Sequence, residues 1–426
     1  MSRLWERCSQ DLLLDLSLDR YGWHTFGSEE AKLRAGITNV PVINFVDTIF
    51  SRAIIMHASD IHFVPGESQV RVRFRIDGLL YEQEYIDLSF APSVISRIKL
   101  LAGIDIGERR LPQDGTLRLL FYPEDMHGRS LHVDVRAATF PSVYGELLVL
   151  RLLHVSKNIL KLSHLGFEAG TCAAMQKQVA SHKGFFIVTG STGSGKTTTL
   201  YTLLNDLDKS KYNVITMEDP VEYHIAGVIQ SQVNTKAGFV FENGLRAILR
   251  QDPDVIMIGE MRDFGSARIA IEAALTGHLV LSTAHAKNAV GVITRLLQMG
   301  IENYLIAEAI SGVLAQVLLR RLCGQCKYED AVSYKESCML HTLALSDIKT
   351  AWRASGCATC FNLGHHGRIA AGELLLMTDD VRASIIQNNE IVYSKLCTRT
   401  LRDAVVEHVK SGIVGLQELL MLLSGS

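Results

Sequence analysis

The chain has 426 residues, of which 47% are hydrophobic and 21% charged, a composition typical of a globular protein with room for two or three domains. Its formal net charge of −2 gives no general attraction to nucleic acid or to an anionic membrane. It has no run of 18 apolar residues and no signal-peptide core near its N-terminus, so we expect a cytoplasmic protein. In that compartment its eight cysteines favour metal binding or core packing over a disulfide framework.

The first part of the chain predicts a polar lead-in followed by a domain of helices and antiparallel strands. Residues 1–36 are polar, with some helical pattern and no clear core. Within 37–155, the segment 69–76 (QVRVRFRI) alternates apolar and charged residues as a half-buried strand does. The pair Asp77-Gly78 that follows is a hairpin-turn signal. We expect residues 156–166 to form a linker.

The remaining residues, 167–426, alternate apolar strands with helical segments, which predicts a parallel sheet wrapped by helices and hence an α/β fold. The strands are expected in GFFIVTG, NVITME, DVIMIGE and HLVLSTAH. The most apolar long segment, 304–322, contains polar residues and ends in arginines, so we expect a buried helix there. A cysteine-bearing insertion covers about 320–372, and a mostly helical tail covers 378–426.

A glycine-rich motif follows the first of these strands. Gly190, Gly195, Lys196 and Thr197 match G-x-x-x-x-G-K-[ST] without a departure. Such a turn aims successive backbone N–H groups and a helix N-terminus at one point, which suits a polyphosphate. Lys196 is expected to reach the β- and γ-phosphates, and the Thr197 hydroxyl to bind Mg²⁺. The candidate nucleotide-binding residues here are Gly190, Ser191, Thr192, Gly193, Ser194, Gly195, Lys196, Thr197 and Thr198.

Acidic residues end two of the other predicted strands. Glu218 and Asp219 follow one strand and Glu260 follows another, so in a parallel sheet all three emerge at the edge that carries the phosphate loop. ATP hydrolysis needs carboxylates of this kind to hold the Mg²⁺ shell and to orient water. Such residues also occur as helix caps or solvated turns. His278 and His285 bracket a further strand, and we expect both near the nucleotide edge.

Several arginines are candidates for binding phosphate charge. Arg246 and Arg250 stand four residues apart and are predicted to share a helix face, and Arg262 follows Glu260 by two. Arg136 and Arg151 lie on predicted strands of the first domain. Each arginine alone is also compatible with a surface salt bridge.

The cysteines form two C-x-x-C pairs, Cys323 with Cys326 and Cys357 with Cys360. Each spacing lets two thiolates hold one tetrahedral ion, and four thiolates suit Zn²⁺. A zinc ribbon can bind nucleic acid, but the sequence around these cysteines is not basic enough, so we expect a structural zinc site and no direct nucleic-acid binding.

Together these motifs resemble those of the secretion ATPases of type II secretion and type IV pilus assembly. GSTGSGKTTTLY resembles the family's Walker A motif, ITMEDPVEY its aspartate box, LRAILRQDPDVIMIGEMRD its Walker B region and ALTGHLVLSTAH its histidine box. The first domain is similar through ASDIHFVP, RVRFRIDGLL, RIKLLAGIDIGERRLPQDG and DVRAATFPSVYGE. The resemblance covers about 37–376.

The resemblance implies a homo-hexameric ring whose subunits combine a PAS-like N-terminal α+β domain, a RecA-like P-loop motor domain and a zinc-binding subdomain. It implies ATP, Mg²⁺ and Zn²⁺ as ligands, with Glu260 and Glu218 in the Mg²⁺ and water shell and His285 in the histidine box. Arg136 and Arg151 would reach nucleotide phosphates, often across a subunit boundary. The family also uses positions around the site that correspond to Arg246, Arg250, Arg262 and Arg295.

The resemblance further implies a motor at the inner membrane that adds pilin or pseudopilin subunits to a filament, for type II secretion, pilus assembly or DNA uptake. Its partners would be a membrane platform protein and the filament-assembly machinery, with membrane association only through them. The histidine box departs from the family pattern at Ala284, Ala286, Lys287 and Asn288. A retraction ATPase and a nucleotide-binding scaffold with little turnover are the alternatives.

Overall fold

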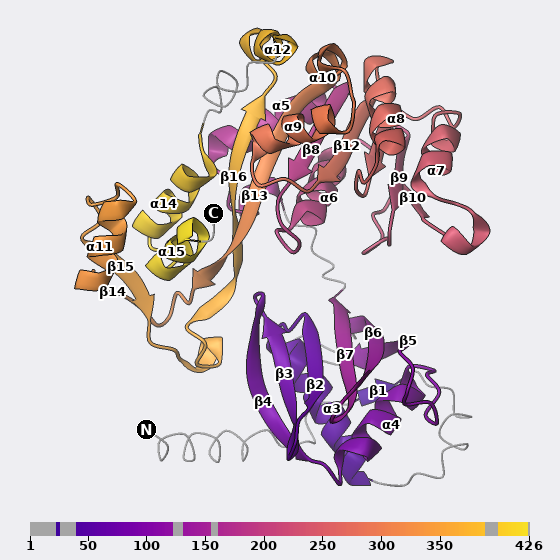
Figure 1. Ribbon diagram of the computed structural model, residues 1–426, viewed down its shortest axis with the longest axis vertical. Coiled ribbons are helices and arrows are strands. Elements are labelled where there is room, and N and C mark those ends of the chain that lie inside the picture. Colours follow the sequence, from indigo (N-terminus) through magenta and orange to yellow (C-terminus); the bar gives the residue numbers. More distant parts are fainter. Residues whose placement is uncertain (1–22, 26–39, 122–130, 155–160, 388–398, 425–426) are drawn as a thin grey trace. The chain divides into compact units, whose positions relative to one another are not determined.

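The structure is a computed structural model, and it divides into two compact units, Met1–Lys157 and Asn158–Ser426 (Figure 1). It describes residues 23–25, 40–121, 131–154, 161–387 and 399–424. Apart from residues 23–25, the proposed lead-in 1–36 lies outside the described residues, as do residues 156–160 of the proposed linker 156–166. Within the described ranges, no helix is both long and apolar enough to cross a membrane.

The first unit is built on a seven-stranded antiparallel sheet with the order β1-β5-β6-β7-β2-β3-β4. Its strands are β1 (Trp23–Thr25), β2 (Asp60–Pro65), β3 (Gln69–Ile76), β4 (Leu79–Asp87), β5 (Gln113–Phe121), β6 (Leu131–Ser142) and β7 (Gly145–His154). In the described part of this unit it is accompanied by two helices, α3 (Val40–Ile55) and α4 (Ala91–Leu101). The sheet and helices agree with the α+β organisation expected for this domain.

Strand β3 confirms the alternation seen in its sequence. Val72 and Phe74 are fully buried, whereas the arginines between the apolar positions are exposed or half-buried. At the turn, Asp77 and Gly78 both have positive φ, 49° and 92°, as a two-residue type I′ hairpin requires. Ile76 then pairs with Leu79 across the hairpin.

A buried ion pair ties α4 to the strands. The Lys99 side chain is 1% exposed, and its Nζ donates to Glu146 Oε1 at 2.8 Å and to the Glu108 carbonyl at 2.6 Å. One ammonium therefore fastens the start of β7 and the loop that follows α4 to the same helix. Because both charges are removed from water, each is stable only while the other is present.

The second unit contains a seven-stranded sheet with the order β10-β9-β11-β12-β8-β13-β16. All neighbours run parallel except β13 and β16. Its strands are β8 (Gly184–Thr189), β9 (Val214–Glu218), β10 (Ile229–Gln232), β11 (Val255–Ile258), β12 (Leu279–Ala284), β13 (Ile310–Leu322) and β16 (His365–Leu376). The α/β prediction for this part of the chain is confirmed.

Helices cover both faces of this sheet, because consecutive strand residues point to opposite sides. Phe186 and Val188 of β8 pack with α5 (Ala169–Ala180) and α6 (Lys196–Asp206). Phe185 and Ile187 pack on the other side, in a core shared by several helices. These are α7 (Phe241–Ile248), α8 (Phe264–Leu275), α9 (Ala289–Gln298), α10 (Asn303–Ala309) and α12 (Asp379–Ile386).

The prediction of one buried helix over 304–322 is wrong. The segment begins as α10 but continues from Ile310 as strand β13. The strand lies between β8 and β16, and the nearest atom of the Phe186 ring would be 3.1 Å from a Cβ placed on Gly312. Pairing with two neighbours therefore overrides the local helical pattern, as tertiary contacts commonly do for apolar segments.

Beyond the sheet, β13 and β16 frame a cysteine-bearing lobe (Figure 1). The lobe contains β14 (Lys327–Ala331), α11 (Tyr334–Thr342) and β15 (Thr350–Ala354), and it packs with α14 (Leu401–Lys410) and α15 (Leu416–Ser424). A buried carboxylate joins this region to the sheet. Glu373 of β16 accepts from the backbone N–H of Ala289, where α9 begins, at 3.0 Å, and from that of Leu401, where α14 begins, at 3.2 Å.

We predict that Glu146→Ala destabilises the first unit by about 3 kcal/mol or more, because it leaves the Lys99 ammonium buried without its carboxylate. The double variant Lys99→Met, Glu146→Leu should cost less than Glu146→Ala alone, since no unpaired charge remains. Urea unfolding measures the loss of stability in each variant, and hydrogen exchange shows whether the loss is located in α4 and β7.

The control is Arg118→Ala, which breaks an ion pair that is exposed on the same sheet and should leave the unfolding midpoint nearly unchanged. Equal losses in Glu146→Ala and in Arg118→Ala would contradict the importance of the buried pair.

Candidate functional site

The phosphate loop joins β8 to α6, and glycines allow its shape. Gly190, Gly193 and Gly195 have φ of 150°, 78° and 83°, a region that favours glycine. A Cβ on Gly190 would lie 2.3 Å from the Gln316 carbonyl oxygen, so no side chain fits there. Because Gly195 is the N-cap of α6, no side chain caps this helix, and its first N–H groups are left for an anion.

The residues predicted to bind nucleotide line this turn. Ser191, Thr192, Gly193 and Thr198 are exposed, Thr197 is half-buried and Ser194 is buried. The side chain of Lys196 folds over the loop, and its Nζ donates to the carbonyls of Gly190 at 2.8 Å and Ser191 at 3.0 Å. Burial lowers the pKa of Lys196, and the Glu260 carboxylate partly offsets this by favouring the charged form.

Glu260 lies at the centre of a charged cluster at the same sheet edge. It follows β11, and its side chain is 20% exposed. It forms an ion pair with Arg262, and its Oε2 lies 3.6 Å from His285 Nε2. Arg262 also approaches Asp219 at 3.8 Å. The structure thus brings together four of the residues predicted from sequence, and Glu260 is the carboxylate that acts on the charge of Lys196.

Glu218 ends β9 at this edge, but it is only 2% exposed. Its carboxylate accepts hydrogen bonds from the hydroxyls of Tyr201 and Thr216, the latter at 2.5 Å, and from Gln230 Nε2 at 3.2 Å. Burial, and then the Glu218 carboxylate, raise the pKa of Tyr201, so the phenol stays a neutral donor. Tyr201 and Gln230 were not predicted as site residues, although Tyr201 follows Lys196 by five residues on α6 and is a buried aromatic with a polar tip.

The altered histidine box is tied to neighbouring elements through its backbone. The Ala286 N–H donates to Thr189 Oγ1 at 2.8 Å, which fastens the box to the end of β8. Asn288 caps α9 by accepting from the Gly291 N–H at 2.8 Å. Arg295 donates to the His285 carbonyl at 3.1 Å. Arg295 therefore braces the loop that carries His285.

His278 does not lie at the nucleotide edge, contrary to expectation. It precedes β12, and the register pairs Leu279 with Gly184 at the start of β8 and Ala284 with Thr189 at its end. Because the strand is six residues long, the edge of the sheet near His278 lies about 17 Å from the edge that carries the phosphate loop. His278 instead closes the end of α8, with Nδ1 2.9 Å from the Ala273 carbonyl.

Arg246 and Arg250 do not share a helix face. Helix α7 ends at Ile248, so Arg250 lies beyond it, in the turn that leads to Asp252, whose φ is 50°. Both arginines are exposed, and Arg246 pairs with Glu242 at 3.0 Å, the ordinary pairing of residues four apart on a helix.

In the first unit, Arg136 of β6 lies directly opposite Arg151 of β7. Side chains of directly paired residues extend to the same face of a sheet, so the two guanidinium groups share one face. Arg151 forms an ion pair with the buried carboxylate of Asp60 at 3.1 Å, and Arg75 approaches the same carboxylate at 3.5 Å. Arg136 is exposed.

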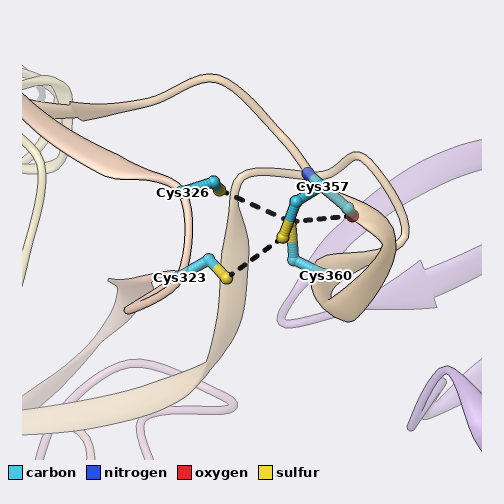
Figure 2. A group of neighbouring side chains, drawn as sticks. All are labelled: Cys323, Cys326, Cys357 and Cys360. Atoms are coloured by element: carbon cyan, nitrogen blue, oxygen red, sulfur yellow. Dashed lines mark hydrogen bonds between the residues drawn. The ribbon is translucent and has the colours of Figure 1, made fainter.

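The four predicted cysteine ligands converge from two turns (Figure 2). The sulfurs of Cys323 and Cys357 lie 3.8 Å apart, as do those of Cys326 and Cys360, and Cys357 and Cys360 lie 3.7 Å apart. Tetrahedral zinc with Zn–S bonds of about 2.3 Å requires S···S separations of about 3.8 Å. The donor set and its dimensions therefore fit Zn²⁺.

Backbone N–H groups surround these sulfurs. The N–H groups of Cys357 and Gly364 donate to Cys360 Sγ at 3.3 and 3.2 Å. A hydrogen bond from the Cys360 backbone lowers the pKa of Cys357 to about 7. At the Cys357–Cys360 turn both effects favour the thiolate, which is the form that binds a metal, whereas burial raises the pKa of Cys326 to about 12.

Comparison with known proteins agrees with this geometry. The family model described as type II/IV secretion system protein matches residues 37–421. The putative type II secretion system protein E of Escherichia coli K12 is 43% identical over 91% of this chain and 77% of its own length. The type II secretion system ATPase E of Vibrio cholerae is 38% identical over 100% of this chain and 85% of its own length. The type IV pilus assembly ATPase PilB of Thermus thermophilus is 41% identical over 88% of this chain but 42% of its own length.

Solved structures show the same fold. The pilus retraction motor PilT with bound ADP has a TM-score of 0.58 and 25% identity, over 88% of this chain and 95% of its own. The Legionella pneumophila ATPase DotB, at 20% identity, has a TM-score of 0.64, and the match covers 90% of this chain and 96% of the DotB chain. Since the family match runs through both units and the relatives are similar along most of the chain, the protein belongs to the type II/IV secretion system protein family.

Proposed function

We propose that this protein is a motor ATPase that hydrolyses ATP to drive assembly of pilin or pseudopilin filaments in a type II secretion or type IV pilus machine. The observation that carries the proposal is the complete phosphate loop with the Glu260 cluster at the same sheet edge. Relatives named as type II secretion ATPase E and pilus assembly ATPase PilB support it.

The proposed site divides its tasks among a few side chains. The loop N–H groups and Lys196 bind the phosphates, and the Thr197 hydroxyl would hold Mg²⁺, which supplies charge neutralisation at the phosphates. Glu260 orients the attacking water and the metal shell, with His285 beside it. Glu218 is buried and held by the hydroxyls of Tyr201 and Thr216, and from there its negative charge contributes to the electrostatic potential at the same sheet edge.

Retraction of a filament is the second candidate function, because the PilT structure is similar to this chain. Assembly is favoured because the secretion and assembly ATPases are more similar, at 38 to 43% identity against 25%. A scaffold without turnover is disfavoured, since the groups that the chemistry needs, Lys196 and Glu260, are present and adjacent.

We also propose that the chain works as a hexameric ring in the cytoplasm, at the inner membrane through a platform protein. The paired arginines Arg136 and Arg151 support this, because they occupy an exposed sheet face where they can serve a nucleotide held by a neighbouring subunit. An arginine donated across a subunit boundary couples phosphate charge to subunit position.

We predict that Lys196→Ala weakens ATP binding as well as turnover, because the ammonium binds phosphate in both the ground and transition states. Glu260→Gln should lower kcat by about 100-fold or more and leave ATP affinity nearly unchanged, because the water and metal interactions grow in the transition state. Equilibrium ATP binding and single-turnover hydrolysis of both variants measure this.

The control for charge loss is Glu272→Gln, which alters an exposed glutamate on α8 and should leave kcat unchanged. Near wild-type hydrolysis by Glu260→Gln, together with loss in Glu218→Gln, would move the catalytic role to Glu218. A wild-type protein that binds ATP without hydrolysing it would support the scaffold instead.

We predict one structural Zn²⁺ per chain, held by Cys323, Cys326, Cys357 and Cys360. Cys323→Ser should reduce bound zinc and lower the thermal midpoint by about 5 °C or more, with a smaller effect on ATP affinity, since metal binding is coupled to folding of the lobe. Elemental analysis and calorimetry measure these effects, and Cys338→Ser, an exposed cysteine of the same lobe, is the control. Wild-type protein prepared without chelators that contains no zinc would rule the site out.

We predict that ATPase activity per chain rises with protein concentration as subunits assemble, and that Arg136→Ala removes most of this rise. The reason is that the arginine completes a site on a neighbour. Rates measured across a dilution series, with assembly followed by light scattering, test this, and Arg71→Ala, an exposed arginine of β3, is the control. Activity per chain that stays constant on assembly would be incompatible with a shared site.

A further inference from the structure

Gln316 lies directly beneath the phosphate loop. It belongs to β13, which pairs with β8 on one side and β16 on the other, and it is 1% exposed. Its Nε2 donates to the Ser194 carbonyl at 2.6 Å, and its Oε1 accepts from Thr199 Oγ1 at 2.8 Å. The amide thus uses its donor on the loop and its acceptor on the first turns of α6.

The loop also packs tightly on this residue. A Cβ on Gly190 would lie 2.3 Å from the Gln316 carbonyl oxygen, and one on Gly195 would lie 3.3 Å from Nε2. Both glycines of the motif therefore approach the same residue, one at the beginning of the loop and one at its end. A contact this close leaves the loop little freedom to change height above β13.

The bond to Ser194 has a consequence for phosphate binding. In a planar trans peptide the C=O and the following N–H point in opposite directions. Because Gln316 holds the Ser194 carbonyl beneath the loop, the N–H of Gly195 is directed away from β13, the direction in which a phosphate bound by the loop must lie. The bond to Thr199 holds α6 at the matching height.

We propose that Gln316 is a positioning residue for nucleotide binding, which fixes the shape of the phosphate loop through Ser194 and Thr199 without touching the ligand. The proposal rests on the proposed ATPase function, because it concerns the same loop. This role differs from packing alone. A buried leucine at position 316 would fill the same space but would bind neither the Ser194 carbonyl nor the Thr199 hydroxyl.

The position of Gln316 predicts which kinetic constant changes. The loop binds phosphate in the ground state and the transition state alike, so its loss of shape should raise KM more than it lowers kcat. Gln316→Leu removes both hydrogen bonds, so nucleotide binding must itself restore the shape of the loop; a cost of about one or two hydrogen bonds corresponds to about a 10-fold or greater loss of affinity. We expect the KM for ATP and the Kd for ADP to rise together by that factor.

The experiment compares Gln316→Leu, Thr199→Val and the double variant, all in the full chain. Thr199→Val removes one hydroxyl with little change of shape, so it remains informative if Gln316→Leu folds poorly. Thr202→Val is the matched control: its hydroxyl is equally buried on α6 but bonds the Thr198 carbonyl and not Gln316. We expect Thr199→Val to weaken ADP binding about 5-fold, Thr202→Val to leave it within 2-fold, and the double variant to lose less than the product of the single losses.

The outcomes separate the two proposals. If the wild-type protein hydrolyses ATP while Gln316→Leu and Thr199→Val keep wild-type KM and ADP affinity, the positioning role is wrong and the ATPase function stands. An equal loss in Thr199→Val and Thr202→Val, or a loss in kcat at constant KM, overturns it as well. If the wild-type protein binds ADP but does not hydrolyse ATP, the proposed function fails, and the ADP measurements still test Gln316.

Discussion

The six-residue parallel pairing of β8 with β12 is the constraint on which the site depends. It brings the phosphate loop and the histidine box to the same edge, because Thr189 pairs with Ala284 where both strands end. The parallel neighbours β9 and β11 deliver Glu218 and Glu260 to that edge as well. A shift of one residue in this register would reverse the faces of every side chain and separate the groups that must act together.

The parts of the site that were predictable from sequence are those encoded by contiguous residues. The loop from Gly190 to Thr197 and the two C-x-x-C turns have spacings that specify their own geometry. The fate of Glu218 was not predictable, because its burial is decided by Tyr201 and Gln230, which different elements supply. Residues 304–322 show the same limit: their pattern allowed a helix, and only pairing with β8 and β16 made most of them a strand.

The two acidic residues show how one sheet edge produces two different carboxylates. Glu260 is partly exposed and lies among Arg262 and His285, groups that can exchange partners as ligands come and go. Glu218 is enclosed by neutral donors that a buried carboxylate needs in place of water. Identical side chains at neighbouring strand ends therefore differ in what they can do, and the difference is made by α6 and β10.

Glu373 couples the positions of two helices. A carboxylate has two oxygens at a fixed separation, and here each holds the first N–H of a different helix, α9 next to the histidine box and α14 beside the cysteine-bearing lobe. The carboxylate therefore holds the starts of α9 and α14 at a nearly fixed distance from each other. A displacement of the loop at His285 that moves α9 must either carry α14 with it or strip a buried carboxylate of a hydrogen bond, so the nucleotide edge and the C-terminal helices are bound to one another's motion.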